Sequence, residues 1–367
     1  MKPKLLFVFG TRPEFIKMYP VIMEAKKSGN EVVVINTGQH KEMLDSLMDY
    51  FNFVPDYNLH VMGQAKGLTE ILTVSLTGIN DILGKEKPDM VLVHGDTSAT
   101  LAGSLAAFYN QIKLAHIEAG LRTFNKYSPF PEEVNRQLTG VIADYHFAPT
   151  ETTKENLLRE GKNPKSIYVV GNSAIDMLSH TLREDYTNPI LTDLNGKKLI
   201  LITAHRRENL EALESIFKAI NTLATNYQDT CEFVYPIHMN PVIREKAAVF
   251  LTAENIKIVE PLNTIDFHNI LSKAYLVLTD SGGIQEEAPA LGIPVLVLRD
   301  TTERPEGVAA GTLKLVGTDT QMIIDGVNEL MENSQQYEQM KKVKNPYGDG
   351  TTSEQIMVII NEEFQSI

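Results

Sequence analysis

Residues 4–17, KLLFVFGTRPEFIK, contain a short apolar run, then a glycine and a threonine, and then a helical pattern that starts at Arg12-Pro13. The same order recurs at residues 275–287, YLVLTDSGGIQEE. A short apolar run without alternation is typical of a parallel strand buried on both faces. Proline is favoured in the first turn of a helix, because its missing N–H would have no partner there. Both segments are therefore predicted to be strand–turn–helix units.

Apolar runs of this kind alternate with helical patterns along the whole chain. They lie at residues 5–9, 31–36, 90–94, 113–117, 145–148 and 166–170, and again at 198–203, 232–237, 256–259, 275–279, 295–298 and 313–316. Strands that alternate with helices predict parallel sheets. A chain of 367 residues also exceeds what one hydrophobic core usually organises. We therefore predict the α/β class, with two doubly wound, Rossmann-like domains.

The break between the two domains is expected near residue 183. Residues 183–198 combine charges with turn-forming Asp, Asn, Pro and Gly and have no apolar periodicity, which is typical of a linker. This divides the chain into an N-terminal domain, residues 1–182, and a C-terminal domain, residues 183–352. The remaining residues, 353–367, read as an amphipathic helix that suits a packing site on either domain.

Composition excludes several classes of partner. The formal net charge of -13 argues against a nucleic acid or an anionic membrane surface, since both require clustered Lys and Arg. No segment approaches the roughly 20 apolar residues of a membrane span, and the first apolar run is too short for a signal peptide. The single cysteine, Cys231, lies in an apolar run and is expected to be a buried thiol. We expect a soluble cytoplasmic protein.

Two turns carry groups that suit phosphate. Arg12 starts a predicted helix, whose N-terminus already favours anions, and Lys17 follows on the same helix. Residues 280–283, Asp-Ser-Gly-Gly, expose backbone N–H groups and a hydroxyl before a helix that contains Glu287. A surface arginine and an ordinary capped turn remain the alternatives. Because the first turn offers only Gly10 and not Gly-x-Gly-x-x-Gly, bound NAD is not expected.

Three carboxylates occupy turns of the first domain. Asp96 follows the strand at 90–94, Glu118 follows the strand at 113–117, and Glu132 opens the helix after Pro131. Singly, each suits a structural role; together, at the ends of neighbouring strands, they suit general acid/base catalysis. Arg136 stands four residues after Glu132, at the spacing of a helical ion pair.

Histidines lie in turns of both domains. His205 closes a strand of the second domain, precedes Arg206, and can hold a phosphate or donate a proton to one. His238 occupies a similar turn. In the first domain His94 and His116 stand near Asp96, but no His-x-x-x-His or Cys-x-x-Cys spacing accompanies them, so no bound metal is expected.

With these residues assembled, the chain resembles the non-hydrolysing UDP-N-acetylglucosamine 2-epimerases along essentially its whole length. The resemblance rests on GTRPEFIKMYP (10–20), TGQH (37–40), HGDT (94–97), HIEAGLRT (116–123), PFPEEVNRQLTG (129–140), GNSAID (171–176), TAHRREN (203–209), HMNP (238–241), DSGGIQEEAP (280–289) and LRDTTERPEG (298–307). A single one of these motifs could occur by chance, but their occurrence together in this order is highly specific.

The resemblance implies a fold like that of the GT-B glycosyltransferases, with the active site in the interdomain cleft and the C-terminal helix packed on the first domain. It implies a homodimer that needs neither NAD nor an essential metal. The residues that match UDP-sugar-binding positions are Arg12, Lys17, Arg136, His205, Ser281, Gly282, Gly283 and Glu287. Those that match catalytic positions are Asp96, Glu118, Glu132 and His205.

The implied activity is the interconversion of UDP-N-acetylglucosamine and UDP-N-acetylmannosamine. The C2 proton of these sugars is not adjacent to a ring carbonyl, so a carboxylate cannot simply remove it. Departure of UDP from C1 makes that proton acidic and yields a 2-acetamidoglucal, to which UDP then re-adds. The alternatives are a GT-B glycosyltransferase, an epimerase that hydrolyses its product, and a UDP-sugar sensor without chemistry.

Some members of the family carry a second, allosteric UDP-N-acetylglucosamine site. Gln39, Arg206 and His238 match residues of that site. Glu42 and Ala65 stand where a glutamine and an arginine are expected. An arginine that pairs with the anion is therefore missing, which argues against allosteric activation.

Overall fold

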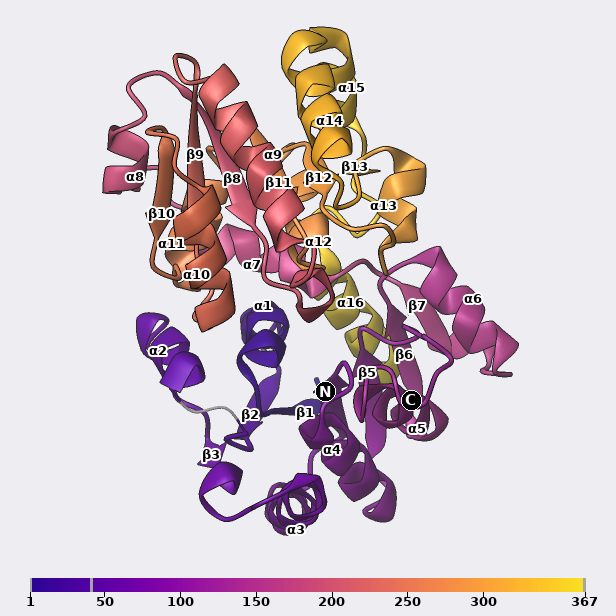
Figure 1. The fold of residues 1–367 in the computed structure, drawn as a ribbon. Helices are drawn as coiled ribbons and strands as arrows, with labels where there is room; N and C mark the ends of the chain where they lie inside the picture. Colours follow the sequence, from indigo (N-terminus) through magenta and orange to yellow (C-terminus); the bar gives the residue numbers. More distant parts are fainter. Residues whose placement is uncertain (1, 40–41, 366–367) are drawn as a thin grey trace. The chain divides into compact units, whose positions relative to one another are not determined.

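The computed structural model describes residues 2–39 and 42–365 (Figure 1), without the side chains of Glu42 and Met43. The chain forms two compact units: unit 1 is Met1–Met177 with Tyr347–Ile367, and unit 2 is Leu178–Pro346. The division falls within helix α7 (Ser173–Thr181), earlier than the expected break at residue 183. Residues 183–198, which were expected to form a linker, belong to unit 2 and include helix α8 (Pro189–Thr192).

Unit 1 contains a seven-stranded parallel sheet in the order β3-β2-β1-β4-β5-β6-β7. Its strands are β1 (Lys4–Phe9), β2 (Glu31–Asn36), β3 (Tyr57–Asn58), β4 (Met90–His94), β5 (Lys113–Ile117), β6 (Tyr145–Ala148) and β7 (Ile167–Val169). Its helices are α1 (Arg12–Lys27), α2 (Glu42–Tyr50), η1 (Val61–Gly63), α3 (Leu68–Glu86), α4 (Ser98–Tyr109), α5 (Glu132–Ile142), α6 (Glu151–Arg159), η2 (Pro164–Ser166) and α16 (Thr352–Gln365).

Unit 2 contains a six-stranded parallel sheet in the order β10-β9-β8-β11-β12-β13. Its strands are β8 (Lys198–Thr203), β9 (Cys231–Pro236), β10 (Ile256–Val259), β11 (Leu276–Thr279), β12 (Val295–Val297) and β13 (Leu313–Leu315). Besides α8, its helices are η3 (Arg207–Asn209), α9 (Leu213–Asn226), α10 (Pro241–Phe250), α11 (Thr264–Leu271), α12 (Ile284–Ala290), α13 (Pro305–Ala310), α14 (Thr320–Glu332) and α15 (Ser334–Lys342).

Both faces of each sheet are covered, as the unbroken apolar strands predict. In unit 1, Leu6 and Val8 of β1 pack against α3 and α4 on one face, and Phe9 contacts Phe15 of α1 on the other. In unit 2, alternate residues of the same strands contribute to two separate apolar clusters. The predicted fold class, with two doubly wound Rossmann-like domains, is confirmed.

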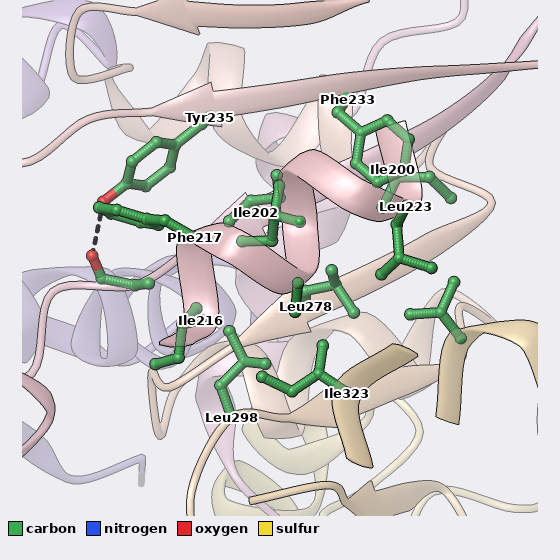
Figure 2. Packing of buried hydrophobic residues seen from close by; sticks show 14 of the residues in the cluster. Ile200, Ile202, Ile216, Phe217, Leu223, Phe233, Tyr235, Leu278, Leu298 and Ile323 are labelled. Atoms are coloured by element: carbon green, nitrogen blue, oxygen red, sulfur yellow. Dashed lines mark hydrogen bonds between the residues drawn. The ribbon is translucent and has the colours of Figure 1, made fainter. Parts of the chain in front are cut away.

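Figure 2 shows the larger of the two clusters in unit 2, in which Phe217 of α9 lies among side chains of β8, β9 and β11. Tyr235 belongs to this cluster, and its hydroxyl donates a 2.6 Å hydrogen bond to the carbonyl of Ala204. Cys231 is fully buried in the same cluster, and burial raises the pKa of its thiol. This cluster supports the strand ends from which the turns of unit 2 project.

The C-terminal helix α16 packs against α1 within unit 1. Its first turn is capped by Asp176, whose carboxylate accepts from the backbone N–H of Ser353 at 2.6 Å and of Thr352 at 3.3 Å. Asn30 donates a 2.9 Å hydrogen bond to Asn361 further along. Among the described helices, not one has the length and apolar character that crossing a membrane requires.

The two sheets share one topological feature that positions the site. In unit 1 the strand order reverses between β1 and β4, and in unit 2 it reverses between β8 and β11. Ligands of open parallel sheets bind beyond the carboxyl ends of the strands at such a switch point. The turns after β1, β4, β8 and β11 are therefore the places where binding groups are expected.

Candidate active site

The turn after β1 is held by a buried carboxylate. Thr11 caps α1 and accepts from the N–H of Glu14, while the Glu14 carboxylate accepts from the N–H groups of Gly10 at 3.0 Å and Thr11 at 2.9 Å. It also accepts a 2.6 Å hydrogen bond from the Thr97 hydroxyl, in the turn after β4. Glu14 thus joins the two turns at the switch point. Sequence reasoning missed this role, although Thr11-x-x-Glu14 is a capping-box pattern.

These turns surround a pocket of about 340 Å³ in unit 1. Three of the residues that line it are the acids predicted from the sequence, Asp96, Glu118 and Glu132. Lys17 and Gln39 also line it. The structure therefore brings the three carboxylates together at one cavity.

Glu118 directly follows the carboxyl end of β5, in a strained conformation with φ 63°, a left-handed value that residues other than glycine adopt at a cost. Its carboxylate forms an ion pair with Lys17 and accepts a 2.9 Å hydrogen bond from Asn172. The His94 Nε2 atom lies 3.9 Å from the same carboxylate oxygen. Lys17 and Asn172 therefore fix the position of the Glu118 carboxylate. Asn172 is a supporting residue that sequence reasoning did not single out.

The surroundings of Asp96 differ from those of Glu118. The Asp96 carboxylate forms a 2.6 Å ion pair with Arg136, and 24% of its side-chain surface is exposed. Burial nevertheless raises its pKa to about 6, because Glu118 and Glu132 reinforce the effect and Arg136 offsets only part of it. Arg136 was expected to pair with Glu132. That prediction was wrong: across the described chain its ion pairs are with Asp96 and, at 3.7 Å, with Glu133.

The two histidines of this region are neutral structural groups at ordinary pH. Burial lowers the pKa of His94 to about 4 and that of His116 to about 3. His116 Nε2 lies 2.7 Å from the carbonyl oxygen of Gly95 and so holds the turn that carries Asp96. Within the described residues, no group of three or more His, Cys, Asp or Glu side chains is arranged to hold a metal ion.

Arg12 is the first residue of α1 and is partly buried. Burial lowers its pKa, and no carboxylate among the described residues offsets that effect. A guanidinium at a helix N-terminus without a counter-charge is suited to an anionic ligand. Arg12 is not among the residues that line the pocket of the three acids.

In unit 2 the turns after β8 and β11 are joined through Asp280, which is fully buried. One of its carboxylate oxygens accepts from the backbone N–H of His205 at 2.9 Å, the N–H of Arg206 at 2.8 Å and the Asn209 amide at 3.1 Å. The His205 ring stacks on the ring of His238, with centroids 5.4 Å apart and planes 6° from parallel. Burial lowers the pKa of His205, whereas the charge of Asp280 raises it.

The glycine turn of residues 281–283 precedes α12 as predicted. A side chain at Gly282 would meet the guanidinium groups of Arg206, at 3.4 Å, and of Arg304, at 3.6 Å. Two cations therefore flank the backbone of this turn, where Gly282 is buried and Gly283 is exposed, which is a suitable arrangement for a diphosphate. Arg304 also pairs with the buried Glu286. Sequence reasoning quoted the Arg304 motif without assigning it a role, since only the fold brings it to Gly282.

Glu287 lies one turn into α12. One of its carboxylate oxygens would be 3.6 Å from a Cβ at Gly283, and the other lies 3.6 Å from His268 Nε2. The Nδ1 atom of His268 is hydrogen-bonded at 2.8 Å to the hydroxyl of Thr181. Glu287 is therefore held beside the glycine turn, as the sequence predicts.

The residues matched to an allosteric site fall in both units. Gln39 lines the acid pocket of unit 1, whereas Arg206 and His238 belong to the turns of unit 2. Ala65 follows η1 and provides no cation. The Glu42 side chain lies outside the described residues, so its contribution stays a prediction.

Comparison with known proteins identifies the family. Residues 23–361 match the model of the family described as UDP-N-acetylglucosamine 2-epimerase. The UDP-N-acetylglucosamine 2-epimerase of Bacillus subtilis is 53% identical over 359 residues, which cover 97% of this chain and 94% of that protein.

Solved structures of similar proteins point to the same family. A putative UDP-N-acetylglucosamine 2-epimerase from Listeria monocytogenes is 50% identical and superposes with a TM-score of 0.95 over 100% of this chain and 98% of its own. The UDP-GlcNAc 2-epimerase of Neisseria meningitidis, solved bound to UDP-GlcNAc, is 48% identical, with a TM-score of 0.86 over 98% of this chain and 100% of its own. Because the family model and these relatives cover almost the whole chain, the protein belongs to the UDP-N-acetylglucosamine 2-epimerase family, as its motifs predict.

Proposed function

We propose that this protein interconverts UDP-N-acetylglucosamine and UDP-N-acetylmannosamine by eliminating and re-adding UDP. The observation that carries the proposal is the placement of Asp96, Glu118 and Glu132 around one pocket. A binding protein or a transferase has no need of three acids around the sugar, whereas an epimerase must move protons on both faces of C2. The relatives named as UDP-N-acetylglucosamine 2-epimerases support the same activity.

The phosphate-binding groups are proposed to promote departure of UDP from C1. Arg206 and Arg304 beside Gly282, with the hydroxyl of Ser281, neutralise the charge that develops on the leaving diphosphate. His205 donates a proton or a hydrogen bond to it. Arg12, which has a helix N-terminus behind it and no carboxylate of its own, contributes a further positive charge. Glu287 binds the ribose hydroxyls.

The acids of unit 1 are proposed to act on the sugar of the same substrate molecule. As the C1–O bond breaks, positive charge at C1 makes the C2 proton acidic, and a carboxylate removes it to give 2-acetamidoglucal and UDP. A proton is then added to the opposite face of C2, and UDP re-adds to C1. One proton leaves C2 and another is added to the opposite face, and the UDP that leaves C1 is added back, so the cycle consumes no oxidant, reductant or water.

The electrostatics of the pocket suit such a pair of steps. Asp96, with a pKa of about 6, exchanges a proton readily near neutral pH. Glu118 pairs with Lys17, whereas Asp96 pairs with Arg136. Two carboxylates in different surroundings suit the two roles of acid and base in one site.

The experiment that tests the proposal is turnover in D₂O. The purified protein is expected to introduce deuterium at C2 of UDP-N-acetylglucosamine and to form UDP-N-acetylmannosamine, with no nicotinamide added. Asp96→Asn and Glu118→Gln are each expected to slow this by about 10² or more while UDP still binds. A sensor or glycosyltransferase would introduce no deuterium, and a hydrolysing enzyme would release free N-acetylmannosamine; either result would contradict the proposal.

We further propose that the protein is a homodimer, as the family resemblance implies, and that it is cytoplasmic, as expected from its sequence. Exposed apolar side chains gather at the C-terminal end of α4, namely Phe108 and Tyr109, and on α5, namely Leu138 and Val141. Such a surface supports self-association. A monomeric mass by light scattering at micromolar concentration would contradict the dimer, and cell fractionation tests the location.

Allosteric activation by UDP-N-acetylglucosamine is not expected, because Ala65 provides no anion-pairing arginine. Initial rates from pure UDP-N-acetylmannosamine are therefore expected to be unchanged by a trace of UDP-N-acetylglucosamine. A marked activation by the trace would contradict this.

A further inference from the structure

Asp280 uses its two carboxylate oxygens unequally. Oδ2 accepts all three hydrogen bonds described above, from the backbone N–H groups of His205 and Arg206 and from Asn209. Oδ1 is fully buried and has no hydrogen-bond partner among the described residues. It lies 3.7 Å from Nδ1 of His205. A buried charged oxygen without a partner is costly and calls for a functional explanation.

Both partners of the His205 imidazole, the His238 ring and the Asp280 carboxylate, are held in place. The His205 ring stacks on His238, whose Nδ1 accepts a 3.1 Å hydrogen bond from the Asn240 N–H, so the stacking partner is itself fixed. The Asp280 carboxylate cannot swing away, because Oδ2 is anchored to the backbone on either side of the His205 side chain. A small shift of the ring closes the 3.7 Å gap to a hydrogen bond, as catalytic contacts often do when the substrate binds.

We propose that Asp280 is a positioning residue that fixes His205 with Nδ1–H toward the carboxylate and Nε2 toward the leaving diphosphate. The inference deepens the proposed function and rests on it for the role of His205. In this arrangement Nε2 carries the transferable proton when the ring is charged, and the carboxylate stabilises that imidazolium. His205 is thereby oriented to donate its Nε2 proton to the leaving diphosphate.

The charges around His205 act in opposite directions. Burial lowers the pKa of the imidazole, and His238, after β9, and Arg206, after β8, lower it further. Asp280, after β11, is the group that raises it. Loss of the Asp280 charge must therefore lower the pKa of His205, so the imidazolium would persist only to a lower pH.

Asp280→Asn is the discriminating variant. It keeps an oxygen for the three anchoring N–H groups and turns an amide N–H₂ toward Nδ1, so that Nδ1 must accept and the neutral ring carries its proton on Nε2. In the ¹⁵N spectrum of protein labelled at histidine, with the His205 signals assigned from His205→Asn, wild type is expected to show the Nδ1–H neutral form. Asp280→Asn is expected to show the Nε2–H form and a lower pKa.

Activity provides a second readout. With Asp280→Asn, kcat is expected to fall by about 10² or more, and the limb of the pH profile that reports His205 should move to lower pH. UDP affinity should stay within a factor of about two, because Asp280→Asn removes an interaction that matters in the transition state and no contact with bound UDP. Asn209→Ala is the matched control, because it breaks two buried hydrogen bonds of the same cluster, to Asp280 and to the Leu298 carbonyl, and leaves the charge.

Three results would overturn the inference: an Nε2–H neutral form of His205 in wild type, an unchanged His205 pKa in Asp280→Asn, or an equal fall of kcat in Asn209→Ala. The first does not depend on Asp280→Asn, so it decides the matter even if that variant does not fold. Failure of the proposed function is a separate result. It would appear as wild-type protein that introduces no deuterium at C2, whatever the spectrum of His205 shows.

Discussion

Replacing Asp96 by asparagine is expected to make the protein more stable while it removes activity. The pKa of Asp96 is about 6 in the folded protein, against an ordinary value of 3.8 for an aspartate. Between these values the folded state binds more protons than the unfolded state, so the ionised carboxylate lowers stability as the pH rises through that range. A shift of about two pKa units corresponds to about 2–3 kcal/mol at pH 8. A neutral amide avoids this cost and still accepts a hydrogen bond from Arg136.

The assay is unfolding of Asp96→Asn and wild type from pH 4 to pH 8. The gain should be small at pH 4, should grow as the pH rises from about 4 to about 6, and should level off above pH 7. For a unit of this size it corresponds to a rise in Tm of about 5–10 °C at pH 8. Asp49→Asn is the control, since it makes the same change of charge at an exposed position of α2 in the same unit. A gain that is absent at pH 8, or equal at pH 4 and pH 8, would refute the reasoning.

Three further outcomes are expected. Arg136→Met removes the stronger of the two cations that lower the pKa of Asp96, the other being Lys17, so the limb of the pH–exchange profile that reports Asp96 should move up by about one unit or more, whereas Arg136→Lys should move it less. Gly282→Ala places a methyl group against the two guanidinium groups of the glycine turn and should weaken UDP binding about tenfold without loss of fold, as titration calorimetry would show. Gly120→Ala should destabilise unit 1 by more than about 2 kcal/mol in urea unfolding, because Gly120 has φ 92° and its new Cβ would lie 2.2 Å from the Thr153 carbonyl oxygen.

The strands were predictable because each is a continuous apolar run. Those at residues 31–36, 90–94, 113–117, 145–148, 198–203 and 256–259 have the predicted bounds, and the others differ by a residue at one or both ends. The exception is β3, which was not predicted, because two residues, Tyr57 and Asn58, are too few to show a periodicity. The end of unit 1 was placed too late, because α7 continues through the division and only packing decides where the units separate.

The sequence predicted which turns carry the site residues, but not which residues those side chains pair with. The position of Asp96, Glu118 and Glu132 after their strands was enough to expect them around one cavity. The pairing of Arg136 with Asp96 was not foreseeable, because helical spacing favoured Glu132, and only the fold brings the start of α5 to the turn after β4. Burial, which sets the pKa of Asp96, likewise cannot be read from the residues beside it in the chain.

The central claim is that cleavage of the C1–O bond to UDP is what releases the C2 proton. Positional isotope exchange tests it most directly, with UDP-N-acetylglucosamine that carries ¹⁸O in the bridge between C1 and the β-phosphorus. During turnover without nicotinamide, the label is expected to move into the non-bridging β-phosphate oxygens at least as fast as deuterium from D₂O enters C2. Deuterium at C2 with the label still in the bridge would contradict the account.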